Sequence, residues 1–266
     1  MDTVDGAAPP DVTPPVAGPV LDGIPSPRAS TPEPSGAPTS TELAPRPSAR
    51  PRAKRVRALL PTPAATPFTL VYAAVLLVTS AITEYADPSL VHTLHQGSST
   101  DVAHLVQYPA LVLFASALWV VGGVGSPYAL GLVVVLTVLE HRIGGRRTAG
   151  VFLLGHVGAT LATEVPVGLA VLAGHLPESS LHRLDYGISF GVAASVGALA
   201  GLLSPWLRWP LLVAFGGVLV DDLIAFQDPM TNWGHLMALG IGVATWPVIR
   251  RSLGGDAVAP VRLDMP

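Results

Sequence analysis

The chain of 266 residues contains no cysteine, and only 12% of its residues are charged. The lack of cysteine excludes disulfide scaffolds, catalytic thiolates and cysteine-ligated zinc or iron–sulfur sites. The zinc-protease pattern His-Glu-x-x-His is absent as well. Half of the residues are hydrophobic, which a soluble domain of this size would struggle to bury. The composition therefore indicates a membrane protein, and the formal net charge of -3 argues against a nucleic-acid partner.

Residues 1–66 are dominated by Pro, Ala, Ser, Thr and Gly, and this composition predicts a disordered tail. Asp2 and Asp5 stand where a signal peptide would carry positive charge. A basic cluster closes the tail just before the first long apolar run: Arg46, Arg50, Arg52, Lys54, Arg55 and Arg57. We expect this cluster to stay in the cytoplasm and to contact anionic lipid, with a specific nucleic-acid-binding or protein-binding arm as the alternative.

Seven apolar runs of roughly membrane-crossing length follow: 68–86, 105–122, 128–141, 149–173, 185–204, 208–226 and 233–250. Basic residues collect on the cytoplasmic side of a membrane, so the turn at 142–147 should lie inside. After the first run leaves the cytoplasm, an odd number of further crossings must return the chain to this turn. One of the two intervening runs therefore cannot cross. We assign this role to 105–122, which contains Pro109, as a re-entrant or interfacial element.

The predicted fold is an all-α, polytopic membrane bundle of six transmembrane helices with an embedded first outer loop. It divides into the tail 1–66, a membrane domain 67–252 and a short C-terminal tail 253–266, with both termini in the cytoplasm. The loops assigned to the outside carry acids, histidines and a single arginine, Arg183. No cofactor and no metal are expected.

Ser189 and His235 are the candidate catalytic pair. On this topology Ser189 lies about 7 Å into a span that starts outside near Leu184, at 1.5 Å per residue. His235 lies about 5 Å into the last span, which also starts outside. A serine needs an imidazole within hydrogen-bond reach to become a nucleophile, and the equal depth would allow this. Small residues beside the pair would let the helices approach closely: Gly187, Gly191 and Gly234. Packing between helices is the alternative role for Ser189.

Three motifs resemble those of the rhomboid intramembrane serine proteases. EHRIGG at 140–145 is similar to their acid-x-Arg-hydrophobic-Gly signature, GIS at 187–189 to the start of Gly-x-Ser-Gly, and GHLMALGIG at 234–242 to the histidine motif of their last helix. The resemblance implies that Ser189 attacks a peptide bond of a transmembrane substrate while His235 acts as general base and then acid. It also implies structural roles for Glu140 and Arg142, and a location in a bacterial plasma membrane.

The sequence departs from this family pattern around the oxyanion site. Phe190 follows the serine where the family has glycine, and Val124 and Tyr128 stand where the family has a histidine and an asparagine. Loss of one oxyanion donor typically lowers the rate by about two to three orders of magnitude. A catalytically inactive rhomboid-like protein that binds transmembrane clients is therefore the alternative function.

Other polar residues in the apolar runs offer further roles. His156, Thr160 and Glu164 fall on one helical face and should point into the bundle, because a charge within the bilayer is expensive. We expect them to form hydrogen bonds between helices. A proton relay of a small proton-linked transporter is one alternative, and orientation of His235 by Glu164 is another. Asp222, near the outer end of its run, could tune the His235 pKa.

Two features of the outer loops remain. Asp185, four residues before Ser189, is interpreted as an acid at the start of a helix. His92, His95 and His104 form only a loose histidine pattern without a neighbouring acid, so we do not expect zinc there.

Overall fold

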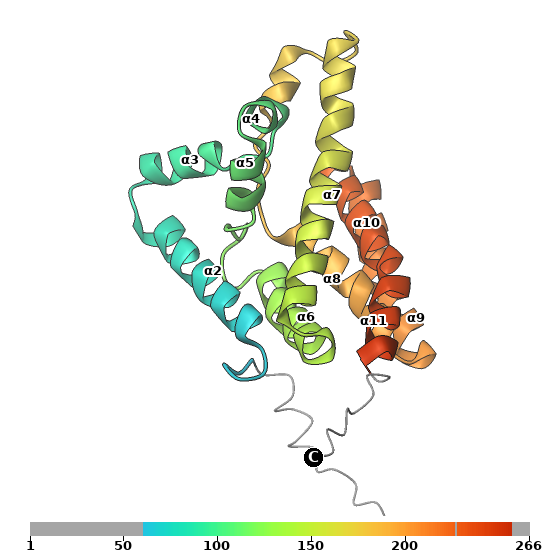
Figure 1. The fold of residues 1–266 in the computed structure, drawn as a ribbon. Helices are drawn as coiled ribbons and strands as arrows, with labels where there is room; N and C mark the ends of the chain where they lie inside the picture. The colour runs from blue at the N-terminus through green and yellow to red at the C-terminus, as the bar shows by residue number, and fades with distance from the viewer. Residues whose placement is uncertain (1–60, 227, 257–266) are drawn as a thin grey trace, which may run out of the picture. The chain divides into compact units, whose positions relative to one another are not determined.

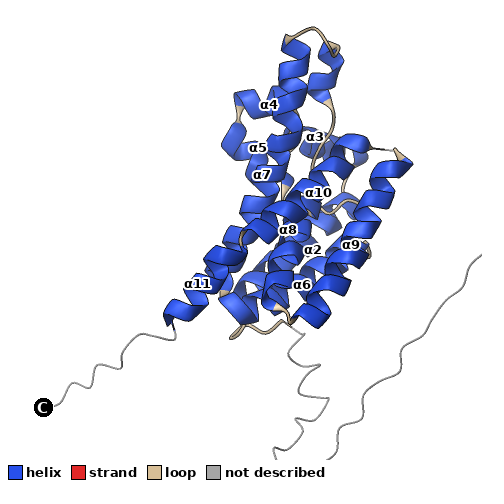
Figure 2. Cartoon of the chain, turned by 90° about the vertical axis from the view of Figure 1, so that its right-hand side faces the viewer, coloured by secondary structure: helices blue, strands red, loops and turns tan. Residues whose placement is uncertain are grey.

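The computed structural model describes residues 61–226 and 228–256, which form helices, turns and loops with no strand (Figure 2). The predicted all-α class is confirmed for this part of the chain. Most of the predicted tail, its basic cluster and residues 257–266 lie outside the described residues. Residues 61–66, the described end of this predicted tail, form a turn in which the Thr62 amide donates to Oγ1 of Thr66 (2.8 Å).

Helices α2 to α11 follow one another along the chain (Figure 1). Proline begins six of them, where its fixed φ suits the first turn and its missing N–H is not needed. Their bounds are α2 Pro67–Tyr85, α3 Pro88–Gly97, α4 Val102–Gln107, α5 Pro109–Ser116, α6 Pro127–Ile143, α7 Gly145–Leu172, the 3-10 turn η1 Glu178–His182, α8 Ser189–Leu202, α9 Pro205–Ala225, α10 Pro229–Ala244 and α11 Trp246–Asp256.

The run 105–122 does not form one long helix. It is broken at Tyr108, where α4 ends, and Pro109 begins α5. The two helices have six and eight residues, so they rise about 9 and 12 Å, far less than the roughly 30 Å of a bilayer core. Neither helix can cross a membrane, which is what the charge pattern required of this run.

Helix α8 begins at Ser189, so the predicted start near Leu184 is wrong. The residues before it form main-chain hydrogen bonds to the outer segment: the Thr100 amide donates to the Asp185 carbonyl (2.7 Å), and the Gly187 amide to the Ser116 carbonyl (3.0 Å). Gly187 has φ 134°, which a residue with a side chain rarely adopts. These contacts delay the helix, and Ser189 is its first residue rather than lying a turn inside it.

The last apolar run, 233–250, forms two helices instead of one. Helix α10 starts earlier than predicted, at Pro229, because the Asp228 carboxylate accepts from the Thr231 amide and caps it. It ends at Ala244, and α11 continues to Asp256, past the predicted end of the domain at 252. His235 therefore lies in the second turn of α10.

Helix α8 is the centre of the bundle. Every residue from Phe190 to Gly201 is buried, and the helix packs against α6, α7 and α10. Small residues allow this: a Cβ on Gly197 or Gly242 would run into the main chain of the facing helix, and one on Gly155 would overlap Ala194. The close approach of α8 and α10 brings the two candidate motifs together.

Length and composition alone identify fewer spans than the charge pattern does. Helices α2 and α7 are each long and apolar enough to cross a membrane, whereas the apolar helix α8 has 14 residues. The six-helix topology stays a prediction, which depends on the charge pattern and not on helix length.

Glu140 joins α6 to the start of α2. Its buried carboxylate accepts from the amides of Phe68 (2.9 Å) and Thr69 (2.8 Å) and from the Thr69 hydroxyl (2.7 Å). The first N–H groups of a helix have no acceptor within it, and the helix dipole favours a negative charge there. Arg142, half a turn later, donates to the Leu202 carbonyl at the end of α8 (3.3 Å). Three helix ends are thus tied together.

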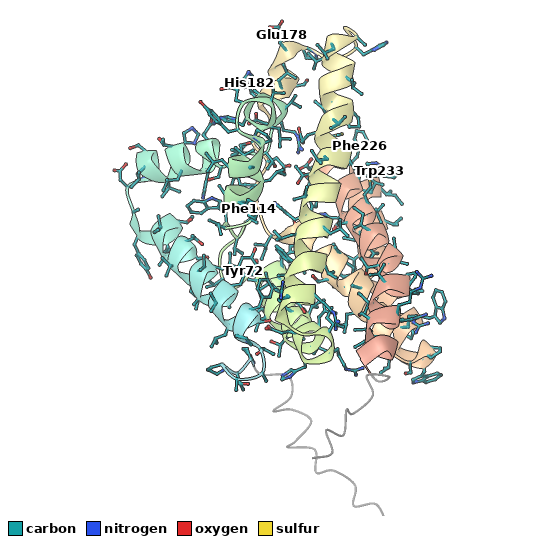
Figure 3. The ribbon with its side chains drawn as sticks, viewed as in Figure 1. Tyr72, Phe114, Glu178, His182, Phe226 and Trp233 are labelled. Carbon is teal, nitrogen blue, oxygen red and sulfur yellow. The ribbon has the colours of Figure 1, made fainter. Side chains whose placement is uncertain are left out.

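Glu140→Gln is expected to lower the free energy of unfolding by about 1.5–3 kcal/mol, because charge-assisted hydrogen bonds to buried donors are lost. Denaturant unfolding of the purified protein in detergent micelles would measure this. Glu178→Gln is the matched control, since Glu178 is exposed on η1 (Figure 3). Equal stability of the two variants would contradict the anchoring role of Glu140.

Candidate active site

Ser189 and His235 line one cavity of about 550 Å³. The cavity is bounded by the start of α8, the beginnings of α6 and α10, and the middle of α7. The two residues come from helices far apart in sequence, and the packing of α8 on α10 brings them together. Although the predicted depth of Ser189 in its helix is wrong, the predicted pair shares a site.

Ser189 and His235 are not hydrogen bonded to each other. His235 is 5% exposed, and neither of its ring nitrogens has a hydrogen-bond partner among the described residues. Both nitrogens of the imidazole are therefore available to another group. Catalytic hydrogen bonds are often long in ligand-free enzymes, so the separation does not exclude the chemistry.

Aromatic rings hold the His235 imidazole. Tyr128 stacks on it with ring centroids 5.3 Å apart and planes at 17°, and Phe190 meets it edge-on at 5.2 Å and 77°. Gly234 makes room for the Phe190 ring, because a Cβ there would overlap it. Phe190 thus points toward α10, and Tyr128, which seemed only to replace an oxyanion donor, is the stacking partner of the histidine.

Glu164 does not orient His235, contrary to the suggested role. Its Oε1 accepts from Nη2 of Arg183 at 2.6 Å, and Glu164 is 1% exposed. Arg183 also donates to Oγ1 of Thr231 (3.1 Å) and lies 3.6 Å from the Asp228 carboxylate. The arginine joins α7 to the beginning of α10. Sequence reasoning missed this role, and the only signal was that Arg183 is the single arginine in the outer loops.

Asp185 pins the segment that leads to Ser189. Its carboxylate accepts from the Thr100 hydroxyl (3.1 Å) and lies 3.7 Å from Arg183. Burial raises the pKa of Asp185, and the nearby Arg183 opposes this shift. Burial alone would lower the pKa of Arg183, but the surrounding carboxylates outweigh it and raise the pKa, so Arg183 stays charged. The prediction that Asp185 lies at the start of a helix is wrong. Asp185 instead fixes the segment that leads into α8.

His156 holds α7 against α5. Its Nε2 lies 3.1 Å from the Leu113 carbonyl and 3.0 Å from the Ser116 hydroxyl. The Thr160 hydroxyl has no partner among the described residues, so no chain of hydrogen bonds runs from His156 to Glu164. His156 thus makes a hydrogen bond between helices, and the described residues form no hydrogen-bonded proton relay between His156 and Glu164.

The sequence matches the family model described as rhomboid-like protein over residues 64–254, from before α2 almost to the end of α11. The chain belongs to the rhomboid-like family. This confirms the resemblance drawn from the three motifs, and it makes the chain a membrane protein of the rhomboid superfamily. No curated protein and no solved structure matches the chain.

Asp222 of this rhomboid-like protein is exposed near the end of α9. Its main-chain oxygen accepts from Nδ2 of Asn232 (2.9 Å), which ties α9 to the first turn of α10. No hydrogen bond joins the Asp222 carboxylate to His235, because the ring nitrogens have no partner in the described part of the chain. Any influence of Asp222 on the histidine would act through space.

Two of the outer-loop histidines of the rhomboid-like domain have separate partners. His95 stacks on Tyr186, with ring centroids 4.4 Å apart, and meets Trp119 edge-on. His104 pairs with the Asp101 carboxylate at 2.8 Å, so the expectation that no acid neighbours these histidines is wrong. Within residues 61–226 and 228–256, no three potential ligand side chains are grouped in a way that could hold a metal ion.

Proposed function

We propose that this rhomboid-like protein is an intramembrane serine protease with a Ser189–His235 dyad. The observation that carries the proposal is that both residues line one cavity while the His235 nitrogens have no hydrogen-bond partner within residues 61–226 and 228–256. A general base needs an available lone pair near the proton that it removes, and His235 has one. Transmembrane segments of other proteins are the proposed substrates.

The start of α8 supports an oxyanion site made of main-chain groups. The first N–H groups of a helix have no acceptor within the helix and carry its positive dipole end. Helix α8 begins at Ser189 without a side-chain cap from any described residue. Main-chain donors at Ser189 and Phe190 do not depend on side-chain type. They would compensate for the missing donors at Val124 and Tyr128.

The reaction would follow the serine protease scheme without a buried acid. Ser189 Oγ bonds to the substrate carbonyl carbon as His235 takes its proton, and the oxyanion forms at the start of α8. The C–N bond then breaks as His235 returns the proton to the leaving amine. Water, deprotonated by His235, cleaves the acyl ester and restores Ser189. The aromatic contacts of Tyr128 and Phe190 would orient the ring, the task that an acid performs in a triad.

The same proposal includes six spans in a plasma membrane with both termini in the cytoplasm. Arg142 and Arg208 lie near the end of α8 that is opposite to Ser189, and Arg208 donates to the Leu203 carbonyl there (2.8 Å). Asp185 and Asp228 lie at the cavity. This separation of charge supports a cytoplasmic Arg142 end and an outward-facing site. A reporter fusion at Gly145 that reads as external would contradict the orientation.

A fluorophosphonate probe tests for an activated serine. We expect labelling of the purified wild-type protein at Ser189, located by mass spectrometry of the digested protein, and its loss in Ser189→Ala. Ser195→Ala is the matched control, because Ser195 lies on the same helix with its buried hydroxyl bonded to the Gly191 carbonyl (2.8 Å). This variant should label like the wild type. A wild-type protein that is folded but resists labelling would count against the protease.

A catalytically inactive protein that binds transmembrane clients is the second candidate. Two observations favour it: the dyad residues are not hydrogen bonded, and the Phe190 ring packs against His235. In that case photo-crosslinking from the cavity should capture the same membrane proteins in wild type and in Ser189→Ala, with no cleavage products in either. Product bands that depend on Ser189 would exclude it.

A further inference from the structure

Several buried polar atoms without a hydrogen-bond partner belong to residues that line the cavity of Ser189 and His235. Among the described residues these are Nδ1 of His156, Oγ1 of Thr160 and both ring nitrogens of His235. His156 and Thr160 are 2% and 1% exposed. A buried polar atom without a partner is destabilising, and native proteins keep few of them. Their grouping indicates that their partners come from a molecule that enters the cavity.

The protonation of His156 follows from its fixed contacts. The Leu113 carbonyl, 3.1 Å from Nε2, can only accept a hydrogen bond, so Nε2 of His156 carries the proton. The Ser116 hydroxyl accepts from the same nitrogen and donates to the Leu113 carbonyl, which agrees with this assignment. In the neutral ring Nδ1 is then a bare acceptor. His156 can offer the cavity an acceptor and cannot act as an oxyanion donor.

We propose that His156 is a specificity residue whose Nδ1 accepts a hydrogen bond from an N–H or O–H of the segment bound in the cavity. This rests on the proposed function in that the cavity is taken as the substrate site. Thr160 lies one turn further along α7, and its hydroxyl can donate to a carbonyl. The two side chains together complement the N–H and C=O of a peptide unit.

The class of ligand depends on which transmembrane segments have a free N–H or O–H to donate to Nδ1 of His156. In an intact transmembrane helix nearly every main-chain N–H is bonded within the helix, so it offers none to His156. A donor comes from a main chain that is locally unwound, or from a hydroxyl or amide side chain. His156 therefore favours segments with a free donor over uninterrupted apolar helices.

Paired peptidyl fluorophosphonates provide the test. The two members of each pair share a sequence and a reactive group and differ at a single amide, which is N–H in one and N–CH3 in the other. Moving the methyl group along the peptide should reveal one position where the N–H probe labels wild-type Ser189 about three- to tenfold faster, which corresponds to one neutral hydrogen bond. His156→Phe should bring this ratio to about one, whereas His156→Gln should keep part of it, because the amide oxygen can accept.

Two controls distinguish the loss of the His156 hydrogen bond from a general effect of the substitution on the fold. Ser116→Ala leaves Leu113 to hold Nε2, so the N–H to N–CH3 ratio should stay at its wild-type value. Because the ratio compares two probes on one variant, a general loss of folded protein cancels. A ratio that His156→Phe leaves unchanged at every amide position would overturn the inference.

The role of His156 can also be tested if no probe labels Ser189. That result would contradict the proposed protease activity but not the role of His156. Nitrogen-15 NMR of the histidine-labelled protein should then show Nε2 of His156 protonated and Nδ1 not, assigned by comparison with His156→Gln. Addition of the N–H peptide without a reactive group should shift the Nδ1 resonance, and the N-methylated peptide should not. A protonated Nδ1, or equal shifts with both peptides, would overturn the role of His156.

Discussion

His235→Ala is expected to slow fluorophosphonate labelling of Ser189 by about two to four orders of magnitude, the usual contribution of a positioned general base. A serine hydroxyl at its free pKa is a weak nucleophile and depends on an imidazole to remove its proton. His235 lines the same cavity as Ser189, and both of its ring nitrogens are buried without a hydrogen-bond partner in the described part of the chain. Second-order labelling rates in detergent, measured by gel fluorescence over time, would give the ratio.

His182→Ala is the matched control for this measurement. His182 is exposed on η1 (Figure 3), so Ser189 of the His182→Ala variant should be labelled at the wild-type rate. His235→Gln, which keeps a polar group against Tyr128 but is not a base, should fall with the alanine variant. A Gln variant that keeps the wild-type rate would show that His235 only fills space, and the dyad would have to be abandoned.

Arg183→Ala is expected to lower the free energy of unfolding by about 3 kcal/mol, near the lower end of what breaking a buried ion pair costs. The partner left behind, Glu164, is 1% exposed and would keep a charge without its cation, whereas Arg183 itself is 27% exposed. The arginine also contacts Thr231 and Asp228 at the start of α10. We therefore expect the first turn of α10 to loosen, which urea unfolding and hydrogen exchange in micelles would detect.

A second substitution separates the charge effect from the loss of packing. Glu164→Gln in the Arg183→Ala background should recover part of the lost stability, because the uncompensated carboxylate is gone. Arg251→Ala, which removes an exposed arginine of α11, should change stability by less than about 0.5 kcal/mol. A loss for Arg183→Ala as small as that for Arg251→Ala would contradict the ion-pair cluster.

The surroundings of Ser189 depend partly on the local sequence and partly on contacts between distant segments. The Gly-x-Ser pattern and the hydropathy placed the serine near an outer helix end, since both depend on neighbours along the chain. The start of α8 at Ser189 depends instead on contacts of residues 184–187 with Thr100 and Ser116. Such contacts join segments more than sixty residues apart, and no local pattern encodes them.

The same limit explains the errors over charged and aromatic residues. The alternative in which Glu164 orients His235 depends only on both residues lying near the outer end of the bundle, but Glu164 accepts a hydrogen bond from Arg183 instead. Tyr128 was considered only as a missing donor, because its alignment says nothing about what its ring touches. The structure places it flat against His235. Tyr72, labelled in Figure 3, likewise reaches from α2 to the Ala117 carbonyl (2.6 Å), a bond that joins two separate segments.

The sequence by itself determined that this chain is a helical membrane protein of the rhomboid-like family, because hydropathy, glycine spacing and short motifs are written in consecutive residues. It also identified Ser189 and His235 as the pair to consider. Only the tertiary structure decided that they line one cavity without a mutual hydrogen bond, that rings rather than an acid hold the histidine, and that His156 presents a bare acceptor nearby. These features arise from the packing of α5, α6, α7 and α10 around the start of α8, and packing is set by all the helices together.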